Sequence, residues 1–109
     1  MSISSITIRK AAAVPMKNPP HPGQHVKSEL EGLNVSVAKA AEALGVTRQQ
    51  LTNVIAGRSS ITPDMALRLE AGIGSTAETW IELQRAYDLA RVRARKPDIT
   101  GHVRRLAPT

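Results

Sequence analysis

The chain has 109 residues, enough for one hydrophobic core with flanking tails, so we expect no second, catalytic domain. It has no cysteine, which excludes disulfides, thiolate zinc sites and a cysteine nucleophile and fits a reducing cytoplasm. The formal net charge of +6 lies in the tails: residues 1–21 carry three basic and no acidic side chains, residues 22–90 carry six and eight, and residues 91–109 carry six and one. The total charge therefore does not by itself identify a nucleic-acid-binding protein.

Residues 1–20 are expected to form a flexible arm. A short alternating piece, ITIR, is followed by an alanine run and then by KNPP, whose prolines disfavour a helix. The apolar run AAAVPM at residues 11–16 is too short for the hydrophobic region of a signal peptide and far too short to span a bilayer. We therefore expect a soluble, cytoplasmic protein that has no contact with a membrane.

A first helix is predicted over residues 22–33. Apolar side chains recur there at i, i+4 and i+7, as on one face of a helix: Val26, Leu30 and Leu33. Pro22 stands at the first helical position, where its missing N–H is harmless, and Asn34 supplies the stop. His21 and His25, at i and i+4, could be metal ligands, but neither a third ligand nor a cysteine accompanies them, so we expect no metal and no cofactor.

A second helix is predicted over residues 36–44, with Ser36 as its cap. Its apolar face consists of Val37, Ala40, Ala41 and Leu44. Gly45 follows and is free to adopt the left-handed conformation that ends a helix and turns the chain sharply. The small alanine side chains allow the next helix to cross this one closely.

A third helix is predicted over residues 47–56, at a fixed angle to the second. Thr47 and Gln50 have the spacing of a capping box, and Val46 and Leu51 have that of a hydrophobic staple. Three of its side chains should be buried: Leu51, Val54 and Ile55. Two short helices joined by such a turn have the geometry of a helix-turn-helix.

A fourth helix is predicted over residues 62–72, opened by a threonine cap and a proline, and a fifth over residues 75–96. Ser75 with Glu78 has the spacing of another capping box, and Pro97 marks the expected end of the fifth helix. The expected fold class is therefore all-α.

Three regions are expected along the chain: an arm at residues 1–20, one helical domain at residues 21–96, and a disordered basic tail at residues 97–109. The simplest interpretation of the basic tail is a solvated end. It could alternatively add nonspecific affinity for DNA, or fold on contact with a partner protein.

The exposed side of the third helix has the chemistry of a DNA-reading helix. Four polar side chains project outward near its N-terminus, the end that enters the major groove in helix-turn-helix proteins: Arg48, Gln49, Thr52 and Asn53. Arginine matches the two acceptors of guanine, glutamine and asparagine match adenine, and a threonine methyl packs against thymine. No acidic residue lies between Glu42 and Asp64, so nothing in this stretch repels phosphates.

Other polar residues around the turn are candidates for contacts with the DNA backbone. They are Ser36, Thr47, Arg58, Ser59 and Ser60. Hydroxyls, guanidinium groups and helix N-terminal N–H groups bind phosphates, which positions a protein without specifying sequence. Gln50 is assigned to the capping box rather than to base reading. The alternative is an ordinary solvated polar face of a small helical domain.

The order of motifs over residues 21–92 resembles a known family. The run is HPG, then TRQQL, then ITPDMALRL, then TWIELQRAYDL. It is similar to the Cro/C1-type, lambda-repressor-like helix-turn-helix, and within it to the HigA and virulence-associated-protein-I branch of antitoxins from type II toxin–antitoxin systems. The arm before HPG and the basic tail after Lys96 depart from that pattern.

The resemblance implies a five-helix domain that forms a homodimer through its C-terminal helix, binds a palindromic operator in its own promoter and neutralises an mRNA-cleaving toxin of the HigB or RelE kind. The dimer surface that it implies consists of Trp80, Ile81, Leu83, Gln84 and Tyr87. The two aromatic residues are first of all candidates for the core. A stand-alone transcriptional regulator without a toxin partner is the alternative. No acid–base pair, phosphate loop or serine with an adjacent histidine is present, so we expect no enzyme.

Overall fold

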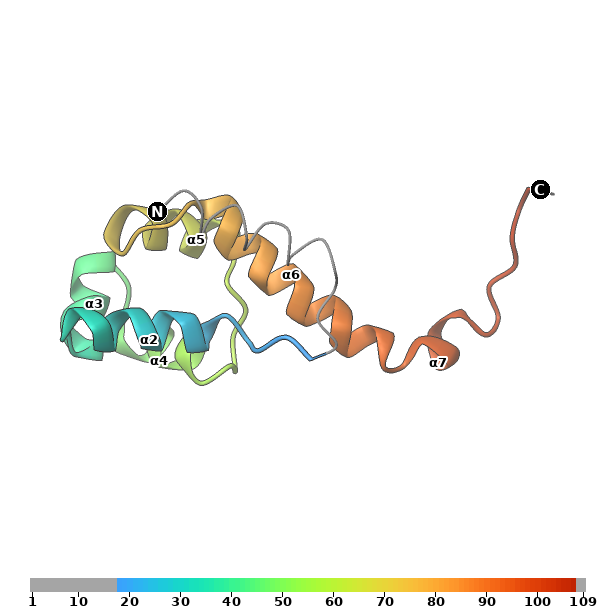
Figure 1. Ribbon diagram of the computed structural model, residues 1–109, viewed down its shortest axis with the longest axis horizontal. Coiled ribbons are helices and arrows are strands. Elements are labelled where there is room, and N and C mark those ends of the chain that lie inside the picture. Colours follow the sequence, from blue (N-terminus) through green and yellow to red (C-terminus); the bar gives the residue numbers. More distant parts are fainter. Residues whose placement is uncertain (1–17, 108–109) are drawn as a thin grey trace, which may run out of the picture.

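The computed structural model describes residues 18–107, and within this range it contains six helices and no strand (Figure 1). The all-α fold expected from the sequence is therefore confirmed. The helices are α2 (Gly23–Leu33), α3 (Val37–Leu44), α4 (Arg48–Ile55), α5 (Pro63–Gly72), α6 (Ala77–Arg93) and α7 (Lys96–Thr100). The first five correspond to the five predicted helices, and α7 is additional.

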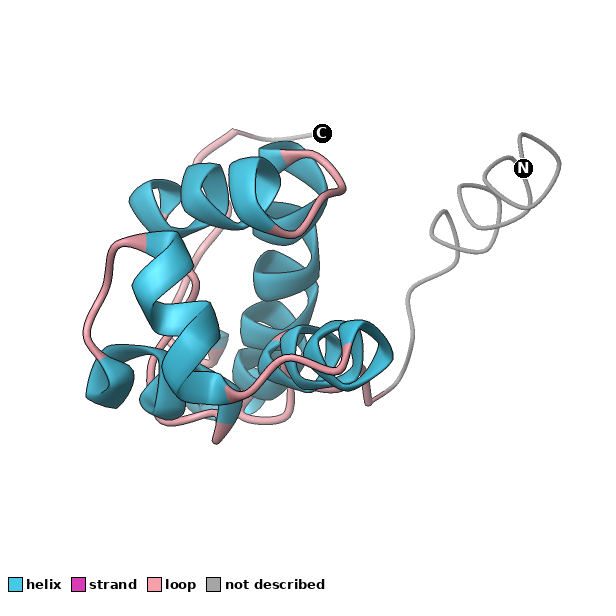
Figure 2. Cartoon of the chain, turned by 90° about the vertical axis from the view of Figure 1, so that its left-hand side faces the viewer, coloured by secondary structure: helices cyan, strands magenta, loops and turns pink. Residues whose placement is uncertain are grey.

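Four short helices and the first half of α6 surround the core. α3 packs on α4 and α5, α2 packs on α4, and α5 packs on α6. Figure 2 shows these helices arranged around a common interior. The second half of α6 leaves the group, and α7 lies at its far end (Figure 1). Among the helices of residues 18–107, none combines the length and the apolar content needed to cross a membrane.

The core consists of apolar side chains from five helices and from the loop before α5. They are Val26, Leu30, Ala40, Ala41, Leu44, Leu51, Val54, Ile61, Met65, Ala66, Leu69 and Trp80. Leu51 of α4 and Leu69 of α5 are completely buried, and each such leucine contributes about 1.5–3 kcal/mol by its removal from water. The predicted burial of Leu51 and Val54 is confirmed, whereas Ile55 is half-buried and packs against the edge of the core.

Three helix starts are capped as predicted. The hydroxyl oxygens of Ser36, Thr47 and Thr62 each accept a hydrogen bond from the backbone N–H three residues later, over 3.2, 3.0 and 3.2 Å. These bonds satisfy N–H groups that have no partner within the helix. Local chemistry therefore determines where α3, α4 and α5 begin.

The start of α6 differs from the prediction. Thr76 is its cap, because Thr76 Oγ1 accepts a hydrogen bond from the Thr79 N–H over 3.1 Å, and the predicted box of Ser75 with Glu78 is wrong. Ser75 has a φ of 61°, in the left-handed region, whereas an N-cap residue needs an extended backbone. Thr76, with φ −105° and ψ 157°, has that backbone.

The end of α6 also differs from the prediction. α6 ends at Arg93, because Arg95, with φ −110° and ψ 21°, leaves the helical conformation. Pro97 does not end a helix but lies in the first turn of α7, where its missing N–H is harmless. Residues 97–100 of the predicted tail are thus part of a short helix, and the disorder expected for the tail stays a prediction.

The start of α2 agrees with the prediction to within one residue. α2 begins at Gly23, so that Pro22 is its N-cap residue rather than its first helical residue. Asn34, with a φ of 58°, ends the helix in the left-handed conformation, as predicted. Residues 1–17 of the predicted arm lie outside the described residues, so the arm stays a prediction.

Candidate nucleic-acid interface

The turn between α3 and α4 has the geometry of a helix-turn-helix. Gly45 has a φ of 75°, which residues with a side chain rarely adopt, and it ends α3. The Val46 N–H then donates to the Ala41 carbonyl over 3.0 Å, which turns the chain back. Ala40 and Ala41 are buried in α3, which packs on α4, and their small side chains allow the two helices to lie close together.

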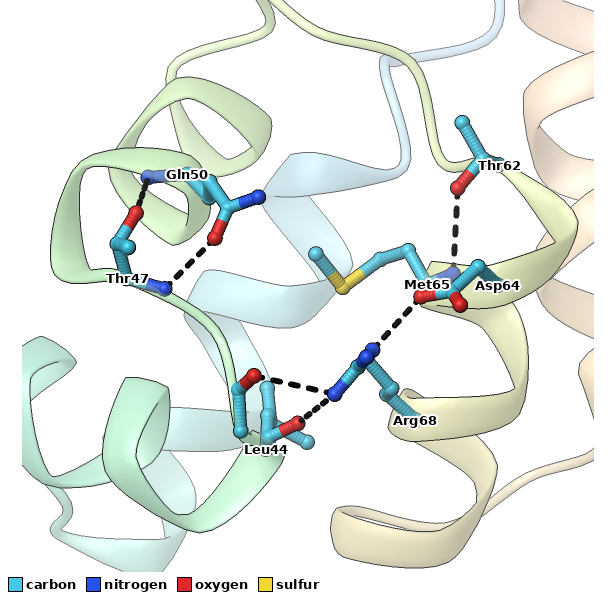
Figure 3. A network of polar contacts seen from close by, with 8 residues as sticks. Leu44, Thr47, Gln50, Thr62, Asp64, Met65 and Arg68 are labelled. Carbon is cyan, nitrogen blue, oxygen red and sulfur yellow. Dashed lines mark hydrogen bonds and ion pairs between the residues drawn. The ribbon is translucent and has the colours of Figure 1, made fainter.

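The start of α4 is held by the predicted capping box of Thr47 and Gln50 (Figure 3). The Gln50 N–H donates to Thr47 Oγ1 over 3.0 Å, and the Thr47 N–H donates to Gln50 Oε1 over 2.7 Å. Gln50 is therefore occupied by the turn, as predicted. Val46 packs against the core that contains Leu51, in agreement with the predicted staple.

Arg68 of α5 holds the same turn from the other side (Figure 3), a role that the sequence does not reveal. Its Nη1 donates to the carbonyls of Leu44 and Gly45, over 2.8 and 3.1 Å, and its Nε donates to Asp64 Oδ1 over 2.7 Å. Both carbonyls lie at the C-terminal end of α3, where the partial negative charge of a helix attracts a cation. Asp64 orients the guanidinium for this contact.

α2 and α4 meet backbone to backbone at Gly23. A Cβ atom at this position would lie 1.9 Å from the Val54 carbonyl oxygen and 3.0 Å from the Ile55 Cα. No side chain fits into that space, so the approach requires glycine. The glycine of the HPG motif thus allows α2 to lie directly against the back of α4.

His21, from the same motif, connects three parts of the domain. Its Nδ1 accepts a hydrogen bond from the Gly23 N–H over 2.9 Å, and the ring lies beside the backbone of Ser59 in the loop after α4. The ring stands edge-on to Tyr87 of α6, with 4.9 Å between centroids. Burial lowers the pKa of His21, although the backbone of Ser59 opposes this shift. Because its Nδ1 bonds the Gly23 N–H and its side chain is buried, His21 is a poor partner for His25 in a metal site.

Three of the predicted DNA contacts form one network at the surface. Gln49 Nε2 donates to Asn53 Oδ1 over 2.9 Å, and Arg58 Nε donates to the same oxygen over 3.2 Å. Arg58, predicted to contact phosphates, therefore lies beside the four side chains predicted to read bases, which we call the reading face: Arg48, Gln49, Thr52 and Asn53. Arg48 is exposed at the first position of α4, and within residues 18–107 its side chain has neither a hydrogen bond nor a salt bridge. Thr52 is half-buried on the same helix.

The remaining candidates for backbone contacts surround this network. The hydroxyl oxygens of Ser36 and Thr47 already accept hydrogen bonds as helix caps. The groups available to a phosphate at these positions are therefore the backbone N–H groups at the N-termini of α3 and α4. Ser59 is half-buried and Ser60 is exposed in the loop after α4. The only charged side chains over residues 43–63 are two arginines, so this surface is electrostatically suited to an anionic partner.

Two of the five residues assigned to a dimer surface are buried inside the subunit. Trp80 is 3% exposed and its Nε1 donates to the Gly74 carbonyl over 3.0 Å. Gln84 is 5% exposed and its Oε1 accepts a hydrogen bond from the Ile61 N–H over 2.8 Å. This is at odds with a place in a dimer surface, which needs accessible side chains. The half-buried members are Ile81, Leu83 and Tyr87.

A groove of about 470 Å³ runs beside the second half of α6. It is lined by Asn18, Pro19, Tyr87, Ala90, Arg91 and Ala94. Ala90 of α6 and Ala94, the residue that caps the C-terminus of α6, give this part of the groove a lining of small side chains.

The sequence of the chain is similar to those of a known protein family and of its members. The helix-turn-helix family (HTH_3) matches residues 26–81, just over half of the chain. Virulence-associated protein A' of Dichelobacter nodosus is 47% identical over 78 residues, which cover 71% of this chain and 68% of the relative.

Solved structures agree with this grouping. The structure of antitoxin GraA matches with a TM-score of 0.77 at 36% identity, covering 82% of this chain and 98% of that one. The structure of Pseudomonas aeruginosa antitoxin HigA with the higBA promoter matches with a TM-score of 0.75 at 30% identity, covering 83% and 100%. The chain therefore belongs to the Cro/C1-type helix-turn-helix family, a family of DNA-binding antitoxins and regulators rather than of enzymes, within its branch of HigA-like and virulence-associated proteins.

Proposed function

We propose that the protein is a DNA-binding antitoxin that represses its own operon. α4 enters the major groove of a palindromic operator with its N-terminus first. The observation that carries this proposal is the start of α4, which the capping box and Arg68 hold while Arg48, Gln49 and Asn53 remain accessible and no acid lies between Glu42 and Asp64 in the sequence. The structure of P. aeruginosa HigA with the higBA promoter supports promoter DNA as the ligand.

The bond between Gln49 and Asn53 suggests which base this face accepts. Gln49 uses its Nε2 and Asn53 its Oδ1, which leaves the Gln49 oxygen as an acceptor and the Asn53 nitrogen as a donor. Adenine presents one donor and one acceptor in the major groove, so the pair matches adenine as a unit. Arg48 matches guanine in the same way. Each such contact contributes about 1–3 kcal/mol of discrimination.

A dimer is part of the proposal, because one short helix reads few base pairs and a palindrome offers two half-sites about one helical turn apart. Accessible side chains follow one another at i, i+4, i+7 and i+11 along one face of α6 and its C-cap residue: Leu83, Tyr87, Ala90 and Ala94. Three of them also line the groove beside α6. We place the second subunit on this face, with Ile81 at its margin, while Trp80 and Gln84 hold α6 on its own domain.

Footprinting of the upstream region with the purified protein tests the DNA contact. Arg48→Ala and Asn53→Ala should each weaken operator binding about ten- to hundredfold while the circular dichroism stays helical. Arg85→Ala is the matched control, because Arg85 is an exposed arginine paired with Glu82 on α6, and it should bind as the wild type does. Wild-type affinity in the Arg48→Ala variant would refute the assignment of the reading face.

The second activity is neutralisation of an mRNA-cleaving toxin of the HigB or RelE kind. The antitoxin names of GraA and HigA support it. Both activities belong in the cytoplasm. Coexpression with the product of the neighbouring open reading frame should restore growth, and the two chains should copurify. If neither occurs while operator binding persists, the protein is a stand-alone transcriptional regulator.

A further inference from the structure

Residues 91–107, the basic arm, are the most strongly charged part of the described chain. Six exposed basic side chains lie in it: Arg91, Arg93, Arg95, Lys96, Arg104 and Arg105. Asp98 is its only acid. Over residues 18–107 none of the six side chains forms a hydrogen bond or a salt bridge, and Arg91 rests on the Tyr87 ring at 5.5 Å. Residues 1–17, 108 and 109 contain no Asp or Glu and so provide no side-chain carboxylate.

The domain that carries the reading face has the opposite charge balance. Residues 22–90 hold six basic and eight acidic side chains. Double-stranded DNA carries one negative charge per about 1.7 Å of its axis, so a slightly acidic domain is not drawn to it by net charge. Arg48 and Arg58 are the only cations near α4 in sequence. The electrostatic attraction that dominates nonspecific DNA affinity therefore needs another source in this chain.

The basic arm is separate from the reading face. It comprises the last turn of α6, α7 and the residues that follow, and Figure 1 shows it at the opposite end of the molecule from α4. Five of its six cations are arginines, whose planar guanidinium groups bind phosphate oxygens in pairs. This chemistry fits a row of phosphates better than it fits base edges.

We propose that the basic arm binds the phosphate backbone of operator DNA outside the base pairs read by α4 and adds salt-dependent affinity. This inference rests on the proposed DNA binding by α4 and adds a second contact region to it. Phosphate contacts carry no sequence information, so the basic arm strengthens binding to any duplex by the same factor.

The test compares the full-length wild type with a variant that carries Arg93→Gln, Arg95→Gln, Lys96→Gln, Arg104→Gln and Arg105→Gln. Arg91 is kept because it packs on Tyr87. The slope of log affinity against log salt should fall by about 0.9 for each phosphate that the variant no longer neutralises. One such phosphate per subunit gives a fall of about 1.8 for a dimer, so from about 50 to 200 mM salt the variant should lose roughly tenfold less affinity than the wild type.

The matched control replaces the same four arginines by lysine and keeps Lys96, which preserves the charge and should preserve the slope. The ratio of affinities for operator and for a scrambled duplex should be the same in the glutamine variant and in the wild type. An unchanged slope in the glutamine variant overturns the proposal and leaves the role of α4 intact. If that variant instead stops copurifying with the neighbouring gene's product, the arm is a protein interface and the proposal is equally wrong. A wild type that does not prefer the operator refutes the role of α4.

Discussion

The two ends of α4 are held by different means. At its N-terminal end, Thr47 and Gln50 bond each other across three residues. At its C-terminal end, support comes from the segment at the start of α2, where Gly23 touches the Val54 backbone and the His21 ring lies beside the backbone of Ser59. The N-terminal end of the reading helix is therefore fixed by its own capping box together with Arg68 of α5, and its C-terminal end by packing against an earlier segment of the chain.

The C-terminal support should be the more sensitive to substitution. Gly23→Ala places a Cβ atom against backbone that cannot rotate away, so it should lower the free energy of unfolding by about 3 kcal/mol or more in urea denaturation. Gly32→Ala on the same helix meets no atom within 4 Å and should raise it by about 0.5–1 kcal/mol. Equal urea midpoints for the two variants would contradict the backbone contact between α2 and α4.

The N-terminal support should have a smaller effect. Thr47→Ala removes the hydroxyl arm of the capping box and should lower the free energy of unfolding by about 1 kcal/mol in the same assay. Ser75→Ala removes a hydroxyl that caps no helix and should change it by less than about 0.5 kcal/mol. A larger drop at Ser75 than at Thr47 would show that the caps are wrongly assigned.

Removal of the Arg68 guanidinium should affect DNA binding more than stability. The Arg68 side chain is 38% exposed, so solvent screening limits the expected destabilisation by Arg68→Met to about 1 kcal/mol or less. Operator affinity should fall as well, because the turn before α4 is then no longer tied to α5. Arg85→Met, which breaks only an exposed pair with Glu82, should alter neither quantity. Equal behaviour of the two variants would mean that Arg68 does not position the turn.

The smallest expected effect is a pH dependence at the C-terminal support. Burial lowers the pKa of His21 in the folded protein below its usual 6.5, so the unfolded chain takes up the proton first as the pH falls. The contribution of His21 is therefore complete above about pH 6.5 and declines as the pH falls through 6.5 toward the lower, folded pKa. His21→Gln should flatten the plot of unfolding free energy against pH, measured by urea denaturation at a series of pH values.

Features that depend on a few adjacent residues could be predicted from the sequence, and the start of α6 shows the limit. Ser75 and Thr76 are neighbouring hydroxyl residues, and each has a polar residue three positions later. The choice between them depends on the turn at Gly74, whose carbonyl accepts a hydrogen bond from Trp80 Nε1. Helix propensity and the spacing of hydroxyl residues give no information about that hydrogen bond. Pro97 is ambiguous for a similar reason, because proline is suited equally to ending one helix and to starting the next.

The candidate DNA-binding site likewise has features that could be predicted from the sequence and features that depend on the fold. The composition of the reading face, its lack of acids and the role of Gln50 follow from a single helix and its cap. The approach of Arg58 to Asn53 depends on the left-handed turn at Gly57, with a φ of 79°. The contacts of Arg68 and of His21 join segments that are distant in sequence, so their partners appear only in the folded chain.

Gln84 gives the packing of α6 a property that a purely apolar core lacks. Its Oε1 accepts a hydrogen bond from the Ile61 N–H over 2.8 Å, and its Nε2 donates to Asp88 Oδ1 over 3.0 Å. Leucine and alanine side chains pack with similar free energy at several rotations of a helix, whereas a buried amide that misses its partner costs about 1–3 kcal/mol. Gln84 thus favours a single alignment of α6, so that the direction in which its exposed second half leaves the domain is fixed by a polar contact as well as by apolar packing.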